Sequence, residues 1–214
     1  MTTPLVVVGA GGFGRETLDV VEAVNEASDT LVFEILGVLD SGPSDVNLAR
    51  LAARGIPFLG SEDAWLEENG KAEYLIGIGS PVIRRTVDEK FVAAGLSAAT
   101  VVHPAATVGS QATLAGGVVI CAGAQVSTNV TLGRHVHLNP NSTIGHDSQL
   151  GDFVSVNPAA IVSGEVIVGS GVLVGAGSVI LQGLTVGEKA VVGAAACVTR
   201  NIDLGLVVKG IPAR

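Results

Sequence analysis

One histidine in the second half of the chain stands beside a carboxylate, in the stretch Ile144–Gly145–His146–Asp147. Imidazole accepts protons near neutral pH, and a carboxylate that binds one ring nitrogen orients the ring and raises its basicity. The pair therefore predicts a general base, which deprotonates an amine or hydroxyl nucleophile. The alternative interpretation is a solvent-facing histidine at a turn.

A glycine-rich segment near the start of the chain predicts an anion site. Gly9, Gly11 and Gly14 form G-x-G-x-x-G directly after the apolar run 5–8 and before a helical pattern. Backbone N–H groups and a helix N-terminus bind phosphate in such loops. Asp40 follows the second apolar run, where a carboxylate accepts from a ribose hydroxyl or a uracil N–H. A tight turn without a ligand and a redox dinucleotide site remain open as alternatives.

The elements that position these groups differ between the two halves. In the first half, apolar runs alternate with helical patterns. Strands are predicted at 5–8, 33–39, 57–59 and 74–78, and helices at 16–25, from 61 onwards and at 84–94. This alternation predicts a small parallel sheet of the doubly wound kind, a Rossmann-like domain over residues 1–96. A redox dinucleotide domain normally has more sheet than these residues offer.

From Val102 onwards the sequence has a period of six. Every sixth residue from Val102 to Val198 is aliphatic, seventeen in succession, and glycine often follows. The period fits a short strand, a tight turn and another strand, so that three hexads make one triangular coil. The aliphatic side chains are expected to fill the prism, and the glycines to supply turn conformations. This predicts a parallel β-helix of about five coils within residues 97–214.

Composition excludes several classes of protein. The 214 residues carry a net charge of −8, which argues against broad binding to nucleic acid or anionic membranes. We find no signal peptide and no apolar run long enough for a membrane span, and we expect a cytoplasmic protein. Cys121 and Cys197 form no C-x-x-C pair. Neither lies beside His146 in the six-residue register, so neither thiol is expected to act as a nucleophile next to this base.

The uninterrupted hexads resemble the left-handed β-helix acyltransferases, and the ending 210–214 (GIPAR) is similar to a terminus common in that superfamily. With a glycine-rich domain in front and the stretch 144–147, the chain resembles the PglD/NeuD-like bacterial sugar acetyltransferases. These include N-acetyltransferases of UDP-4-amino sugars and sialic acid O-acetyltransferases. The resemblance implies a small Rossmann-like domain (α/β) followed by a left-handed parallel β-helix (all-β).

The resemblance also implies a reaction and its residues. It implies a homotrimer that uses acetyl-CoA as co-substrate, has no tightly bound cofactor or metal, and acetylates a UDP-linked amino sugar. His146 is the implied base and Asp147 its orienting partner. The implied acceptor contacts are Gly11, Gly12, Phe13, Asp40, Ser41 and Gly79. The implied acetyl-CoA contacts are Ser155, Gly164, Ala176 and Ala194, with the Gly164 N–H facing the thioester oxygen.

Two departures from the family keep alternatives open. Relatives often have histidine where this chain has Phe13 and Ser155. One alternative is therefore O-acetylation of a sugar, and another is a non-catalytic nucleotide-binding scaffold. A third is a zinc site at a trimer interface built from His135, His137 and His146, as in γ-class carbonic anhydrases. Those enzymes lack the N-terminal domain, and their histidine spacing differs.

Overall fold

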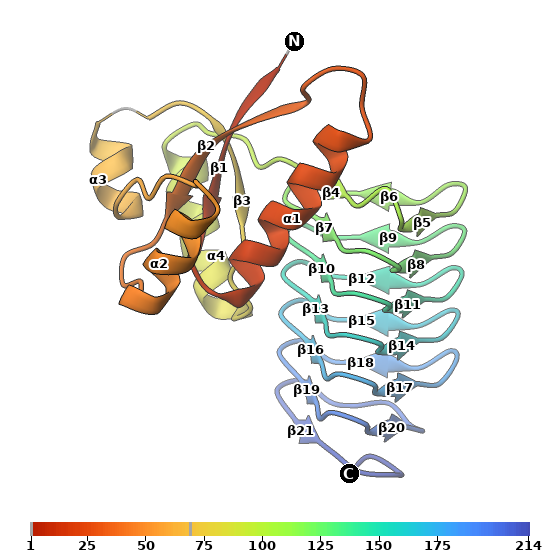
Figure 1. Ribbon diagram of the computed structural model, residues 1–214. Helices are drawn as coiled ribbons and strands as arrows, with labels where there is room; N and C mark the ends of the chain where they lie inside the picture. The colour runs from red at the N-terminus through yellow and green to blue at the C-terminus, as the bar shows by residue number, and fades with distance from the viewer. Residues whose placement is uncertain (1, 69) are drawn as a thin grey trace. The chain divides into compact units, whose positions relative to one another are not determined.

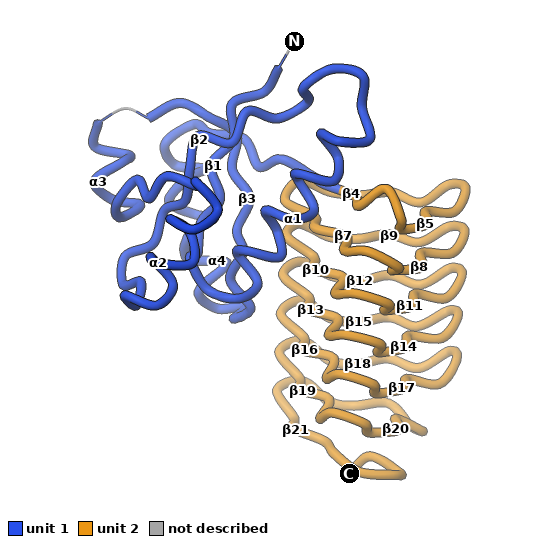
Figure 2. Tube along the Cα trace, in the orientation of Figure 1, with its two compact units in different colours: residues 1–101 blue, residues 102–214 orange. Residues whose placement is uncertain are grey.

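The computed structural model describes residues 2–68 and 70–214 and contains two compact units (Figures 1 and 2). The first unit spans residues 1–101 and the second residues 102–214. Each has its own hydrophobic core. No helix among the described residues is long and apolar enough to cross a membrane.

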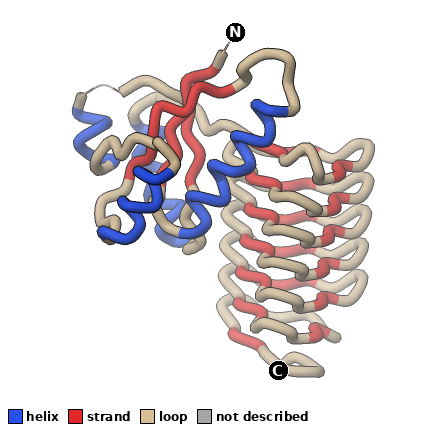
Figure 3. The backbone as a smooth tube through the Cα atoms, viewed as in Figure 1, coloured by secondary structure: helices blue, strands red, loops and turns tan. Residues whose placement is uncertain are grey.

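The first unit is a three-stranded parallel sheet with helices, as its sequence predicts (Figure 3). The strand order is β2-β1-β3. The strands are β1 (Thr3–Val8), β2 (Phe33–Leu39) and β3 (Glu73–Ile76), and the helices are α1 (Gly12–Glu26), α2 (Asp45–Ala53), α3 (Glu62–Glu67) and α4 (Pro81–Ala93). The apolar centres of β1 and β3 are fully buried, which is typical of a sheet covered on both faces.

Two local features of this unit differ from the prediction. Helix α2 was not predicted, because Leu51 is its only buried residue and the apolar stripe is therefore weak. The strand expected at 57–59 is reduced to one bridge, between Phe58 and Val38. This segment is too short to extend the sheet beyond β2.

The second unit is a parallel β-helix with three faces of seven, six and five strands. The first face contains β4 (Val101–Val102), β7 (Val119–Ile120), β10 (His137–Leu138), β13 (Ser155–Val156), β16 (Leu173–Val174), β19 (Val191–Val192) and β21 (Val207–Val208). The second contains β5 (Thr107–Val108), β8 (Gln125–Val126), β11 (Thr143–Ile144), β14 (Ile161–Val162), β17 (Val179–Ile180) and β20 (Cys197–Val198). The third contains β6 (Thr113–Leu114), β9 (Thr131–Leu132), β12 (Gln149–Leu150), β15 (Ile167–Val168) and β18 (Thr185–Val186).

The six-residue period positions the core. Each predicted aliphatic residue is the second residue of one of the strands β4–β20. Neighbours on a face are eighteen residues apart, as in the pairs Thr143–Ile161 and Ile144–Val162. The aliphatic side chains therefore stack in columns inside the prism, and those from Ile120 onwards are buried.

The glycines of the β-helix have a different role from the turn role that the sequence predicts. From Gln111 to Ala195 a left-handed residue occurs every six positions, three after an aliphatic, and it is often not glycine, as at Asn129 (φ 58°) and Ala159 (φ 57°). Glycines directly after an aliphatic, such as Gly145, do not have this conformation. A Cβ on Gly145 would collide with the backbone N of Gly164 in the next coil. These glycines are thus required for close stacking of coils rather than for the turn.

Candidate active site

His146 lies at the corner of the β-helix where the chain leaves β11 for the third face. Its Nδ1 is 2.7 Å from Oδ2 of Asp147, and both side chains are about half exposed. The carboxylate only accepts hydrogen bonds, so Nδ1 carries the proton and Nε2 is left as the acceptor. Asp147 occupies the left-handed turn position (φ 60°), which Asp tolerates better than most residues.

Asn129 binds the carboxylate of this pair, a role that the sequence analysis did not predict. Its Nδ2 donates to Oδ1 of Asp147 over 2.9 Å from the equivalent position one coil earlier. The hydrogen bond from Asn129, followed by that from His146, lowers the pKa of the Asp147 carboxyl. The six-residue period could have identified Asn129, because residue 129 precedes residue 147 by one eighteen-residue coil.

Gly164 lies one coil after His146, directly beside the imidazole. A Cβ at this position would be 2.6 Å from Nε2 and 2.7 Å from Cε1 of His146. Only glycine therefore leaves room for the ring in this orientation. No described residue accepts a hydrogen bond from the Gly164 N–H, which is left as a donor close to the ring.

The other residues expected to bind acetyl-CoA lie elsewhere on the β-helix. Ala176 and Ala194 are exposed and lie in successive coils at the corner between the first and second faces, where Ala195 N–H donates to Ala176 O over 2.8 Å. Ser155 is buried at the start of β13, where it pairs with His137. It follows His146 by nine residues, half a coil, and so lies on a different face.

The remaining histidines are separate from this site. His135 stacks on Phe153 with ring centroids 5.6 Å apart, and His137 is buried in β10. Nδ1 of His103 accepts the N–H of Ala105 over 2.9 Å. Within residues 2–68 and 70–214, no group of three His, Cys, Asp or Glu side chains is arranged to hold a metal ion.

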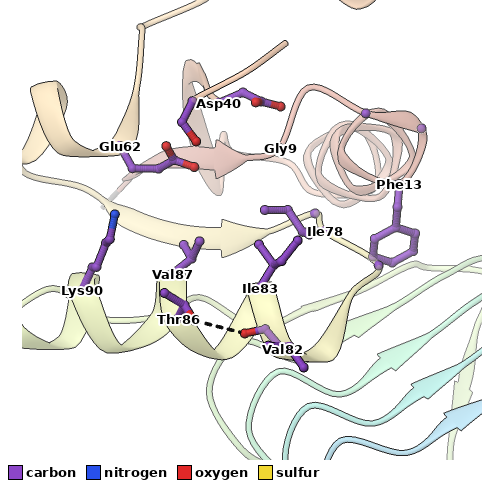
Figure 4. A pocket seen from close by; sticks show the side chains of 15 residues that line it. Gly9, Phe13, Asp40, Glu62, Ile78, Val82, Ile83, Thr86, Val87 and Lys90 are labelled. Atoms are coloured by element: carbon purple, nitrogen blue, oxygen red, sulfur yellow. Dashed lines mark hydrogen bonds between the residues drawn. The ribbon is translucent and has the colours of Figure 1, made fainter. Parts of the chain in front are cut away.

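The first unit contains a pocket of about 570 Å³ at the carboxyl ends of its strands (Figure 4). Strand order reverses at β1, which is where open α/β sheets bind ligands. The residues expected from the sequence to bind the acceptor all line it: Gly11, Gly12, Phe13, Asp40, Ser41 and Gly79.

The N-terminus of α1 forms one end of this pocket. Ser44, Ser61 and Ser80 cap the other three helices with their side chains, whereas Gly11 caps α1 without one. The start of α1 therefore has no side-chain cap, and helix N-termini of this kind bind anions. A Cβ on Gly11 would meet nothing within 4 Å. A Cβ on Gly14, in contrast, would collide with the Gly9 carbonyl, so the pattern serves packing as well as binding.

Asp40 fixes the glycine turn. Its Oδ2 accepts from the Ala10 N–H and its Oδ1 from the Gly42 N–H, both over 2.8 Å. The carboxylate is thus largely committed to the backbone. The sequence suggested it only as a ligand contact.

Arg84 of α4 stabilises the wall of the pocket that residues 77–79 form. The sequence did not predict this role. Its fully buried guanidinium donates to Ile78 O over 2.8 Å and to Gly79 O over 3.2 Å. Burial lowers the pKa of Arg84 to about 9, so the group is still charged at neutral pH. These bonds fix the segment 77–79, which lines the pocket.

Comparisons with known proteins agree with both units. Residues 4–91 match the family model of the PglD N-terminal domain. The acetyltransferase domain of PglB from Neisseria gonorrhoeae is 30% identical, with a TM-score of 0.86 over 100% of this chain and 99% of that chain. It has also been solved with acetyl coenzyme A. No curated protein sequence matches the chain.

Two further structures cover nearly the whole chain. PerB from Caulobacter crescentus, in complex with CoA and GDP-perosamine, is 26% identical, with a TM-score of 0.86 over 99% of this chain and 96% of that chain. WeeI from Acinetobacter baumannii is 26% identical, with a TM-score of 0.85 over 100% of this chain and 99% of that chain.

Proposed function

The chain belongs to the PglD-like family of hexapeptide-repeat sugar N-acetyltransferases, and from this premise we propose that it acetylates the amino group of a nucleotide-linked amino sugar. Acetyl-CoA is the acetyl donor, and the chain is an acyltransferase. His146 acts as the general base. The observation that carries the proposal is the chain of hydrogen bonds from Asn129 through Asp147 to His146.

The proposed transfer is direct. The sugar nitrogen attacks the thioester carbonyl carbon, and Nε2 of His146 takes the proton that this nitrogen loses. The tetrahedral intermediate collapses, the C–S bond breaks, and the CoA thiolate leaves and receives the proton from His146. Asp147 stabilises the imidazolium between these two steps, because its carboxylate already accepts from Nδ1.

Gly164 supplies the oxyanion contact in this scheme. Charge develops on the thioester oxygen as the amine attacks, and a backbone N–H aimed at that oxygen stabilises the transition state. The Gly164 N–H meets this need because its residue lies beside the imidazole and no described group accepts from it.

The pocket of the first unit is proposed to bind the nucleotide of the acceptor. The N-terminus of α1, which has no side-chain cap, faces the pyrophosphate, and Ser41 supplies a hydroxyl for the ribose. The sequence resemblance implied UDP as the nucleotide, whereas the complex of PerB contains GDP-perosamine. Phe13 lines the pocket without a group that accepts protons, which leaves the proton transfer to His146.

The test measures thiol release from acetyl-CoA with UDP- and GDP-linked 4-amino sugars and with sialic acid. Replacement His146→Ala is expected to lower kcat by about two to four orders of magnitude, while calorimetry still detects acetyl-CoA and nucleotide binding. His103→Asn, which removes an imidazole whose Nδ1 accepts from the nearby Ala105 N–H, is the control and is expected to keep its activity. Unchanged turnover in His146→Ala would remove the base from the mechanism. Release with sialic acid alone would identify an O-acetyltransferase.

A further inference from the structure

The pocket of the first unit contains a buried carboxylate that has no role so far. Glu62 is the first residue of α3, whose start is fixed by the Ser61 side chain, which accepts from Ala64 N–H over 3.2 Å. The residue is only 6% exposed and lines the pocket. Figure 4 shows its side chain entering the pocket at the end opposite Phe13.

The Glu62 carboxylate forms no hydrogen bond or ion pair with any described residue. Lys90 lines the same end, but its Nζ is bonded to Oδ1 of Asp63 over 2.7 Å. Asp40 is committed to the Ala10 and Gly42 N–H groups. With no protein partner, the Glu62 carboxylate is available to a ligand in the pocket that brings N–H or O–H donors.

The order of groups along the pocket indicates which part of a nucleotide reaches this end. The anion-binding N-terminus of α1 lies at the Phe13 end (Figure 4). From Val82 to Lys90, α4 runs along the pocket for about 12 Å, the length of eight helical rises. Val87 of this helix lies in the same half of the pocket as Glu62 and provides an apolar surface that suits a flat base. With the pyrophosphate at α1, the nucleobase lies at Glu62.

On the proposed function of this pocket, we propose that Glu62 selects guanine as the base of the acceptor nucleotide. A carboxylate has two acceptor oxygens and no donor, and it binds best to two parallel N–H groups. Guanine presents such a pair, N1–H and the 2-amino group. Uracil presents one N–H between two carbonyl oxygens that repel the carboxylate, and adenine and cytosine each place an acceptor nitrogen beside their amino group.

Calorimetry with nucleoside diphosphates tests this on the unmodified protein. GDP is expected to bind at least tenfold more tightly than UDP, and IDP, which lacks only the 2-amino group, about tenfold more weakly than GDP. Tighter binding of UDP than of GDP would overturn the assignment of the base. If amino-sugar acetylation then proceeds with UDP-linked substrates, the proposed function stands without the selection of guanine. If acetyl-CoA binds and no nucleoside diphosphate does, both the selection of guanine and the acceptor role of the pocket are wrong.

The variant Glu62→Gln separates base recognition from a structural role. Its carboxamide turns one N–H donor toward guanine, so GDP affinity is expected to fall at least tenfold, and GDP and IDP to bind within about twofold of each other. UDP is expected to bind no more weakly than to the unmodified protein. Glu67→Gln, the same change at an exposed position of α3, is the control. An equal loss for all three nucleotides in Glu62→Gln would place Glu62 on the ribose or in the scaffold and overturn the proposal.

Discussion

The hydrogen bond from Asn129 determines the charge and orientation of Asp147, and through Asp147 those of the imidazole. The pKa of the Asp147 carboxyl is lowered, first by this bond and then by the bond from His146. The stabilising effect of these bonds is therefore present above the ordinary carboxyl pKa of about 3.9 and is lost as the pH falls through the lowered value. At neutral pH the carboxylate is ionised and available to the imidazolium.

We predict that Asn129→Gly lowers kcat about tenfold and leaves the KM for acetyl-CoA nearly unchanged. Glycine retains the left-handed turn, so the change removes only the amide that orients Asp147. Steady-state kinetics at neutral pH, where the Asp147 carboxylate is ionised in both proteins, measures both parameters.

Gln111→Gly is the matched control for this prediction. Gln111 occupies the same left-handed position one coil before Asn129, with φ 60°. Its replacement removes an amide from the same corner without touching Asp147. Equal kinetics in the two variants would mean that Asn129 does not position the base.

At the scale of elements, the turns of the β-helix carry measurable strain where the left-handed residue is not glycine. Ala159 has φ 57°, a conformation that costs an L-residue with a Cβ about 1 kcal/mol. We predict that Ala159→Gly raises the free energy of unfolding by about 0.5–1 kcal/mol, measured by chemical denaturation. Ala160→Gly, next along the chain, removes a buried methyl group without relieving strain and is expected to destabilise by about 1 kcal/mol. A loss of stability in Ala159→Gly would contradict this account of the turns.

The sequence predicts the strands of the β-helix more completely than the turns or the helices. Seventeen strands follow from one period, because each inward position must be aliphatic. The turn conformation has no comparable signal, since residues as different as Phe153 and Asp147 occupy it. Helix α2 lacked a signal for a similar reason, because it buries only Leu51.

The candidate site could also be predicted from the sequence only in part. The predicted acceptor contacts all line the pocket, because a glycine pattern and strand ends mark these positions locally. Glu62 was not, since nothing in its neighbourhood indicates that α3 turns this carboxylate into the pocket. Asn129 required the pairing of positions eighteen residues apart, which the period contains but the motif around His146 does not.

At the scale of the whole molecule, three of the four residues expected to bind acetyl-CoA, Gly164, Ala176 and Ala194, occupy two corners of one β-helix. Gly164 shares the corner of His146, between the second and third faces, and Ala194 lies at the corner between the first and second. A trimer with heterologous interfaces brings different surfaces of neighbouring chains together. We therefore expect each complete site to combine His146 of one chain with Ala194 of another, in a particle three times the 21.4 kDa chain mass by light scattering.

Complementation between two inactive variants tests this arrangement. His146→Ala removes the base, and Ala194→Glu places a charged side chain on the path expected for acetyl-CoA, so each variant alone is expected to be inactive. In randomly mixed trimers, about one site in four combines an intact His146 with an intact Ala194 from the neighbouring chain, and activity returns to about a quarter of the unmodified value. The double variant His146→Ala/Ala194→Glu mixed with either single variant brings no such pair and stays inactive. If the co-expressed single variants also stay inactive while forming trimers, the site is contained in one chain. A monomeric particle would exclude the shared site altogether.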